Sequence, residues 1–295
     1  MRFMNIRPMP LQKGDTLGIV SPSSPLRLKS IDLSVHYLHE MGFKLRFGAH
    51  YQDEERFLAG SDVDRAQDMM SFFADPDIKA IICSRGGQGS QRLLPLLDYE
   101  IIAQNPKILV GFSDTTALQL GILKKTGLIS YTGFTLTTAL TPLIKETLLA
   151  CLMNEPYRIV AGECVNPGII QGSLVGGNLS LITSLIGTPY QPDFRGKILL
   201  LEDVGTEPFN VDRMLSHLEL ASVFAQVSGI VFGTFEQCIS KDPEEGTIDE
   251  VITEWSTRFK VPCIKSFSYS HGEISCVLPL GGQISLNASA SSLSF

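Results

Sequence analysis

The stretch "ILVGFSDTTALQL", residues 108–120, decides the fold of the first half of the chain. The apolar run 108–110 is typical of a buried strand, Gly111 ends it, and the residues from Ala117 onward predict a helix. Ser113 therefore stands at a corner between a strand and a helix. A serine at such a corner either caps the helix or serves as a nucleophile whose oxygen the corner exposes. The corner reads G-x-S-D-T rather than G-x-S-x-G, so the local pattern alone favours the cap.

Strands and helices alternate on the N-terminal side of this corner. We expect strands at 16–22, 44–48, 80–87 and 107–112, and helices at 27–42, from 61 onward, at 90–103 and after Ser113. Such alternation with short turns predicts a parallel sheet with helices on both faces. Ligands of these sheets bind beyond the carboxyl ends of the strands, where "SRGGQGS" and "GFSD" both fall.

Prolines at 142, 156 and 167 indicate a boundary in the middle of the chain. We predict an N-terminal α/β domain over 1–145, an inter-domain linker over 146–167 and a C-terminal domain over 168–295. The second domain is expected to be smaller and richer in strand, with helices at 179–186, 209–221 and 248–258 and a final hairpin turned at Gly281-Gly282.

The composition excludes several classes of function. The chain has 295 residues, with 24 basic and 31 acidic side chains, and no cluster of Lys and Arg of the kind that binds nucleic acid. Its six cysteines form no C-x-x-C pair, which argues against a zinc knuckle or a redox dithiol, and the apolar runs around several of them indicate a reducing compartment. No apolar stretch approaches membrane-spanning length, and the N-terminus does not resemble a signal peptide. We therefore expect a soluble cytoplasmic protein.

A histidine and a pair of acids are candidates for chemistry. His36 and His39 lack the spacing of a helical metal motif and are expected on a solvated helix face. His271, in "SYSHGEI", lies instead in a loop between two strands. Glu202 and Asp203 end the apolar strand "KILLLEDV", and because neighbouring strand residues point to opposite faces, at most one of them should face a site.

Two glycine-rich turns precede helices, "SRGGQGS" at 84–90 and "GGN" at 176–178. Each is either a tight turn or a set of backbone amides brought close to an anion. A serine, an acid, a histidine and an amide-rich loop together are the groups that acyl transfer requires.

These parts, in this order, resemble a known family. The segments that carry the resemblance are "RGGQG", "GFSDTTAL", "GSLVGGNLSLI", "GTPYQPDFRGKILLLEDVG", "EPFNVDRMLSHL" and "SHG". Over nearly its whole length the chain resembles the LD-carboxypeptidases, serine peptidases that include muramoyltetrapeptide carboxypeptidase and the microcin C7 self-immunity proteins. The resemblance implies a flavodoxin-like N-terminal domain, a swivelling β-rich C-terminal domain, and a homodimer.

The resemblance also implies a catalytic triad of Ser113, Glu202 and His271, with the serine as nucleophile. The backbone amides of Asp114 and Gly87 would form the oxyanion hole, and neither a metal nor a cofactor would take part.

The residues assigned to substrate binding are Arg85, Gly86, Gln88 and Asn178. Gln88 stands where the family usually has tyrosine, and Gln119 stands where it usually has histidine. The resemblance therefore defines the substrate specificity of this chain less closely than its catalytic activity. Arg85 would either bind a substrate carboxylate or brace its own loop, and both interpretations stay open.

Three functions remain in competition. The first is an LD-carboxypeptidase that removes terminal D-alanine from a muropeptide during peptidoglycan recycling. The second is a microcin-immunity-type peptidase that cleaves aminoacyl-nucleotides, for which an aromatic platform would be useful. The third is a two-lobed protein that binds a small ligand without catalysis.

Overall fold

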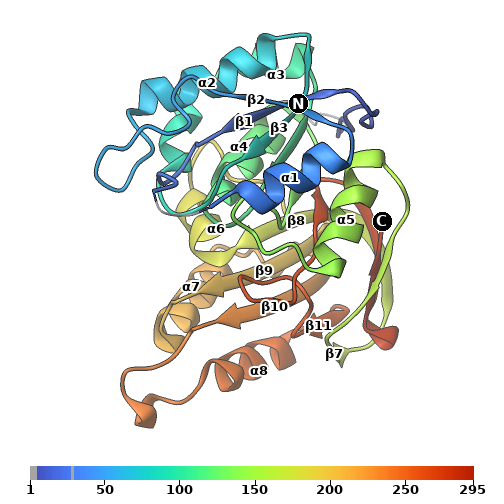
Figure 1. The fold of residues 1–295 in the computed structure, drawn as a ribbon. Coiled ribbons are helices and arrows are strands. Elements are labelled where there is room, and N and C mark those ends of the chain that lie inside the picture. The colour runs from blue at the N-terminus through green and yellow to red at the C-terminus, as the bar shows by residue number, and fades with distance from the viewer. Residues whose placement is uncertain (1–4, 28–29) are drawn as a thin grey trace. The chain divides into compact units, whose positions relative to one another are not determined.

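The computed structural model describes residues 5–27 and 30–295 and divides the chain into two compact units (Figure 1). The N-terminal unit comprises Met1–Glu155 and the returning segment Val277–Gly281. The C-terminal unit comprises Pro156–Cys276 and Gly282–Phe295. Among the helices of the described ranges, none combines the length and apolar character that crossing a membrane requires.

The N-terminal unit is built on a mainly parallel sheet. Its strands are β1 (Thr16–Val20), β2 (Lys44–Phe47), β3 (Ile78–Cys83), β4 (Ile108–Gly111), β5 (Ser130–Thr132) and β12 (Leu278–Leu280). They are ordered β12-β5-β4-β3-β1-β2. Strands β1 to β5 run parallel in the order 2-1-3-4-5, which is the flavodoxin-like arrangement, and β12 adds to β5 antiparallel. The predicted α/β class is confirmed.

Helices cover both faces of this sheet (Figure 1). They are α1 (Asp32–Glu40), α2 (Asp62–Ala74), α3 (Tyr99–Gln104), α4 (Thr116–Thr126) and α5 (Pro142–Met153), with short 3₁₀ turns η1 (Ser90–Leu96) and η2 (Ser113–Thr115). Right-handed crossovers place α2, α3 and α4 on one face and α1 on the other. Instead of the single helix expected over 90–103, η1 and α3 form separately, because Pro95 lies inside the first and Asp98 caps the second.

The C-terminal unit contains a larger mixed sheet. Its strands are β6 (Arg158–Val160), β7 (Glu163–Asn166), β8 (Ile169–Asn178), β9 (Ile198–Val204), β10 (Gly229–Glu236), β11 (Cys263–Lys265), β13 (Gln283–Asn287) and β14 (Ser292–Ser294). They are ordered β6-β14-β13-β8-β9-β10-β11-β7, and the central strands β8 to β11 run parallel. The helices are α6 (Leu179–Leu185), α7 (Pro208–Leu220) and α8 (Ile248–Arg258), with 3₁₀ turns η3 (Pro243–Glu245) and η4 (Ala288–Ala290).

The middle of the chain differs from the predicted linker over 146–167. This stretch contains the end of α5, which belongs to the N-terminal unit, and the strands β6 and β7 of the C-terminal unit. One of the prolines that suggested a linker has another role. Pro142 occupies the first turn of α5, where a missing N–H costs nothing.

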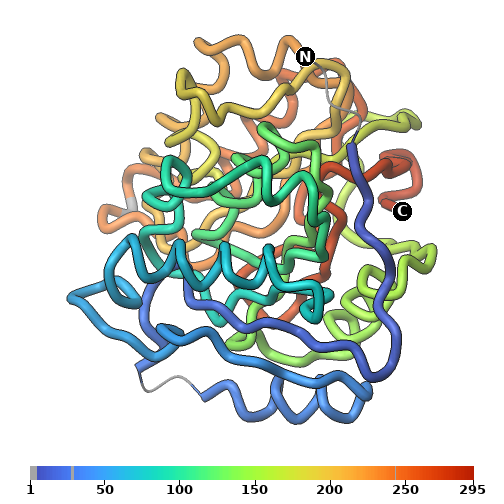
Figure 2. Tube along the Cα trace, turned by 90° about the horizontal axis from the view of Figure 1, so that it is seen from above, coloured from blue at the N-terminus to red at the C-terminus, as the bar shows by residue number. Residues whose placement is uncertain are grey.

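The predicted hairpin at Gly281-Gly282 is wrong. Strand β12 on one side of these glycines pairs with β5 in the N-terminal unit, whereas β13 on the other side pairs with β8 in the C-terminal unit. Figure 2 shows the red segment of the chain that runs beside green segments of the N-terminal unit. Alternating apolar residues around two glycines do not reveal which sheet each strand joins.

Candidate active site

Ser113 occupies a strained corner directly after β4. Its φ angle is +64°, in the left-handed region that non-glycine residues rarely adopt. A Cβ at Gly111 would overlap the Thr115 side chain, so the strand can end this tightly only on glycine. Among the described residues, no side-chain hydrogen bond caps the start of α4. Ser113 therefore has the backbone geometry of a nucleophile elbow rather than the role of a cap.

The glycine loop after β3 packs against this serine. A Cβ at Gly86 would lie 2.8 Å from Ser113 Cβ and 3.1 Å from Ser113 Oγ. Gly87 has a φ of +119°, and a Cβ there would overlap the Ser24 hydroxyl. Within the part of the chain that the structure describes, the Gly87 N–H makes no hydrogen bond. The loop thus places backbone that carries no side chains next to the nucleophile.

The carboxylate of Asp114, which is 1% exposed, fastens this loop in place. Its Oδ2 accepts from Ser90 N–H at 2.8 Å and from the Ser23 hydroxyl at 2.6 Å. The Oδ1 atom accepts from Gly89 N–H at 3.1 Å, and the backbone carbonyl of Asp114 accepts from the Ser90 hydroxyl at 2.6 Å. The sequence suggested only a role for the backbone amide of Asp114, and the structural role of its side chain was missed.

Arg85 and Gln88 make contacts that hold the loop from its other side. Arg85 Nη1 donates to the Pro25 carbonyl at 2.8 Å, and Gln88 N–H donates to Ser24 Oγ at 3.0 Å. Burial, and then the charge of Arg27, lower the pKa of the Arg85 guanidinium. The hydrogen bond to Pro25 therefore supports the interpretation in which Arg85 braces its own loop. Its Nη2 lies beside Gly87, 3.5 Å from the position a Cβ would take there, so the same guanidinium borders the amide-rich loop.

In the C-terminal unit, the half-buried His271 pairs with the buried Glu202. Glu202 lies near the end of β9 with no exposed surface, and its Oε2 is 2.8 Å from His271 Nδ1. Burial raises the pKa of Glu202, and the hydrogen bond and charge of His271 oppose that rise. The hydrogen bond from His271 thus favours the charged form of the carboxylate, and the carboxylate in turn fixes the orientation of the imidazole.

The neighbouring side chains show that Glu202 and Asp203 face in different directions, as strand alternation predicts. Asp203 Oδ2 accepts from the N–H and the hydroxyl of Ser180 at 2.9 and 2.7 Å, at the start of α6. Asn178 caps the same helix through Leu181 N–H and donates from Nδ2 to Glu202 Oε1 at 3.2 Å. Asn178, expected to touch substrate, therefore contacts Glu202 directly.

The candidate residues thus form two groups. Ser113, Asp114 and the loop 85–88 lie together in the N-terminal unit. Glu202, His271 and Asn178 lie together in the C-terminal unit.

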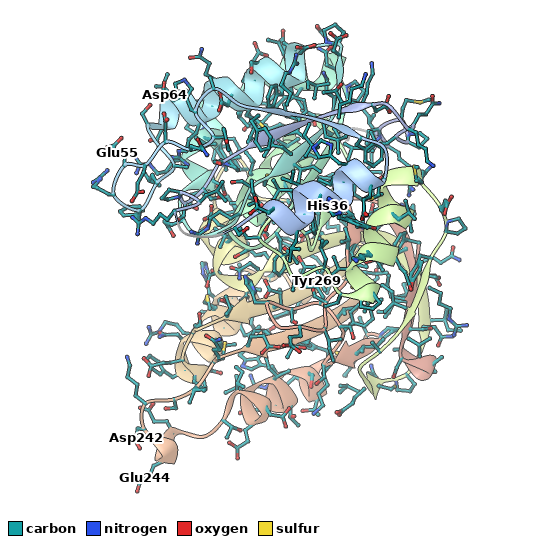
Figure 3. All side chains as sticks on the ribbon, viewed as in Figure 1. His36, Glu55, Asp64, Asp242, Glu244 and Tyr269 are labelled. Atoms are coloured by element: carbon teal, nitrogen blue, oxygen red, sulfur yellow. The ribbon has the colours of Figure 1, made fainter. Side chains whose placement is uncertain are left out.

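One cluster with metal-ligating side chains was not found from the sequence. Ligand atoms of His50, Asp53 and Asp64 lie within 4.8 Å of one another in the N-terminal unit, where Figure 3 labels Asp64 on α2. His50 Nδ1 is 2.8 Å from Asp53, and this hydrogen bond is the main cause that raises the pKa of His50. The arrangement is explained by hydrogen bonding and charge attraction between the imidazole and the carboxylates of Asp53 and Asp64. His36, also labelled in Figure 3, is 72% exposed and pairs with Glu40, as expected for a solvated helix face.

Comparisons with known proteins identify the family. The LD-carboxypeptidase N-terminal domain matches residues 17–133, and the LD-carboxypeptidase C-terminal domain matches residues 171–286.

The chain belongs to the LD-carboxypeptidase family. It is 33% identical to a protein of Bacillus subtilis named a probable murein peptide carboxypeptidase, over 96% of this chain and 92% of that one. The solved structure of MccF in complex with glutamyl sulfamoyl guanosine has a TM-score of 0.88 at 29% identity, covering 98% of this chain and 97% of that one. The muramoyltetrapeptide carboxypeptidase of Oxalobacter formigenes has a TM-score of 0.85 at 26% identity, covering 95% of this chain and 97% of that one.

The first prediction concerns the Asp114 carboxylate. We expect Asp114→Asn to lower the free energy of unfolding by about 1–3 kcal/mol, because its amide N–H₂ cannot accept from the Ser23 hydroxyl or the amides of Gly89 and Ser90. Hydrogen–deuterium exchange should accelerate over residues 85–93. Asp98→Asn is the matched control, since Asp98 also accepts two backbone amides but only caps α3. Unchanged exchange over 85–93 in the Asp114 variant would contradict the assigned role.

Proposed function

We propose that this LD-carboxypeptidase family member is a serine peptidase that uses Ser113, His271 and Glu202 as its triad. The observation that carries the proposal is the pair of His271 and the fully buried Glu202, joined at 2.8 Å. A buried acid that orients an imidazole is the arrangement by which a histidine accepts a proton from a serine. The strained corner at Ser113 supplies the matching nucleophile.

In the proposed mechanism, His271 Nε2 accepts the Ser113 proton as the serine oxygen attacks the scissile carbonyl. Glu202 stabilises the imidazolium that results. The backbone amides of Gly87 and Asp114 hold the oxyanion, and a water activated by His271 then releases the acyl-enzyme. Gly86 allows this approach, because any side chain at its position would crowd Ser113.

For the substrate, we propose a murein tetrapeptide from which terminal D-alanine is removed after an L-centre of the diaminopimelate type. The name of the Bacillus subtilis relative, a murein peptide carboxypeptidase, supports this class of substrate. An exopeptidase must also recognise a free carboxylate beside the scissile bond. The amide-rich loop and the Arg85 guanidinium beside Gly87 are the groups we assign to it. Gln88 is exposed on the same loop and is free to contact the peptide.

A microcin-immunity-type activity is the second candidate, favoured by the similarity to MccF. Trp255, the only tryptophan of the chain, would be the obvious platform for a base. It is 3% exposed, packs against Phe224 and donates from Nε1 to Asp212 at 2.8 Å. Because this ring is buried in the core of the C-terminal unit, it does not offer a platform for a base, and we therefore prefer the peptide substrate.

The first catalytic prediction tests the triad as a unit. We expect Ser113→Ala and His271→Ala each to abolish turnover of murein tetrapeptide, with the double variant little slower than either single one. The measurement is kcat/KM by chromatography of released D-alanine, with circular dichroism to confirm folding. Losses that multiply independently would exclude a shared mechanism. Covalent labelling of Ser113 by a serine-reactive probe would also exclude a protein that only binds its ligand.

The second catalytic prediction separates the two adjacent acids. Glu202→Gln should reduce kcat far more than Asp203→Asn, because Glu202 contacts His271 whereas Asp203 accepts from Ser180 at the start of α6. Asp203→Asn should act mainly on the melting temperature. Similar losses of kcat in folded protein would mean that the acid of the triad has been misassigned.

The third catalytic prediction concerns the free carboxylate of the substrate. The tetrapeptide with a free C-terminus should be cleaved efficiently, and the same peptide with an amidated C-terminus poorly, in a comparison of kcat/KM by mass spectrometry. Equal rates on the two peptides would contradict the exopeptidase hypothesis and favour the microcin-type amide hydrolase instead.

A further inference from the structure

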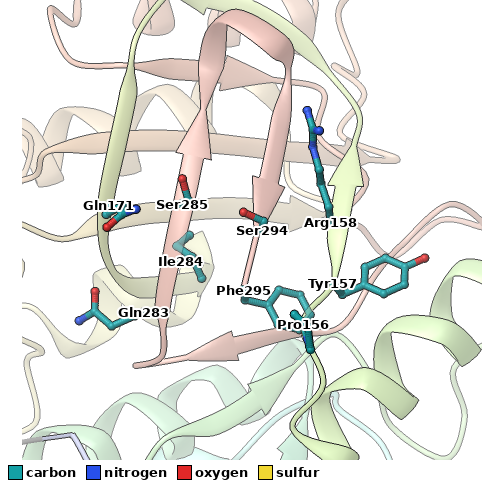
Figure 4. Close-up of a pocket in the computed structure, with 9 residues that line it drawn as sticks. All are labelled: Pro156, Tyr157, Arg158, Gln171, Gln283, Ile284, Ser285, Ser294 and Phe295. Atoms are coloured by element: carbon teal, nitrogen blue, oxygen red, sulfur yellow. The ribbon is translucent and has the colours of Figure 1, made fainter.

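A pocket of about 560 Å³ lies on the C-terminal unit over strands β8, β13, β14 and β6 (Figure 4). None of the residues assigned to catalysis lines it. Its volume lies within the range typical of small-molecule sites. It is therefore a separate feature of this unit that the proposed catalysis does not use.

The floor of the pocket is a single row of polar side chains. The strand register places Gln171 opposite Ser285, Ser285 opposite Ser294, and Ser294 opposite Arg158. Directly paired residues point to the same face of a sheet, and Figure 4 shows the four side chains in a line across the strands. Because neighbouring strands lie about 4.8 Å apart, the row is about 14 Å long.

These side chains are available to a ligand. Among the described residues, the side chains of Gln171, Ser285 and Ser294 have no hydrogen-bond partner, and the same holds for Gln283 beside them. Arg158 contacts only the Ser292 hydroxyl, from Nη2 at 3.3 Å, which leaves most of its donors free. Amides and hydroxyls each donate and accept, so the floor complements a ligand rich in groups that do both.

An aromatic pair borders the Arg158 end of the row. Tyr157 and Phe295 form reciprocal backbone hydrogen bonds, and their rings stack with centroids 6.4 Å apart. Both residues line the pocket (Figure 4). They add apolar ring surface to the lining of the pocket, which suits a ligand with both polar edges and C–H faces.

We propose that this pocket binds a sugar acid, a mono- or disaccharide that carries one carboxylate. The hydroxyl and amide row would bind the sugar hydroxyls, the aromatic rings would pack on its C–H face, and Arg158 would bind the carboxylate. No acidic side chain stands among the described residues that line the pocket, which disfavours a cation. An extended peptide would pair with the backbone at a sheet edge, whereas β13 and β14 are already paired on both sides and only the three-residue strand β6 of this pocket lies at the edge. The proposal does not depend on the catalytic one.

The test uses two matched pairs of probes, glucuronate with glucose and N-acetylmuramate with N-acetylglucosamine, titrated onto the full chain by saturation-transfer difference NMR. We expect saturable binding, tighter for the acid of each pair. Arg158→Met should weaken binding of the acids about tenfold and leave the neutral sugars unchanged, as expected for the loss of a charged hydrogen bond. Gln171→Ala with Ser285→Ala should weaken both members of each pair.

Arg195→Met is the matched control, because Arg195 is an exposed arginine of the same unit that pairs with Asp193 outside the pocket. It should leave binding of all four sugars unchanged. The absence of saturable binding would overturn the proposal. Binding that persists unchanged in the Arg158 and Gln171/Ser285 variants would do the same. A change from dimer to monomer in these variants, without an effect on sugar binding, would also overturn the proposal, because the surface would then be an interface between copies of the chain.

Discussion

The buried carboxylate of Asp114 is the interaction on which the N-terminal half of the candidate site depends. It follows β4 and accepts hydrogen bonds from Ser23, which follows β1, and from Gly89 and Ser90, which follow β3. These three strands are neighbours in a parallel sheet, so their carboxyl ends meet at one edge. One carboxylate can therefore tie three loops together. The glycines of this loop have no side chains that could hold them, and an acid that follows the neighbouring strand β4 supplies hydrogen bonds that order the loop.

In the C-terminal unit, two adjacent carboxylates have separate roles, one at His271 and one at the start of α6. Glu202 faces His271 and Asn178, whereas Asp203 faces Ser180 at the first turn of α6. Asn178 caps that same helix, so the helix start, the strand end and the imidazole are linked in one hydrogen-bonded chain. Asp203 interacts with the positive N-terminal end of α6, which leaves Glu202 to contact His271 and Asn178.

Much of this architecture was predictable from residue patterns. Buried apolar runs and N-caps such as Ser61 located β1, β4, β9 and α2 within a few residues, and alternation correctly separated the directions of Glu202 and Asp203. The sequence could not reveal that β12 and β13 join different sheets, because strand partners are chosen by long-range packing. It also could not reveal the carboxylate of Asp114 as a structural anchor. The signal was present in Ser23, a hydroxyl at the end of a buried strand, but its partner lies 91 positions away.

The geometry at Ser113 explains why this corner departs from G-x-S-x-G. A non-glycine residue in the left-handed region costs about 1–3 kcal/mol, and the φ of +64° at Ser113 must be stabilised by its surroundings. Each hydrogen bond to an ionised carboxylate contributes roughly 1.5–3 kcal/mol, and the Asp114 carboxylate, on the very next residue, accepts three. Thr115 adds a bond from its hydroxyl to the Phe112 carbonyl at 3.0 Å, across the corner. Polar side chains therefore stabilise in this protein the turn that a second glycine would permit elsewhere. The "SDT" that first suggested a helix cap holds the half-buried serine at this corner.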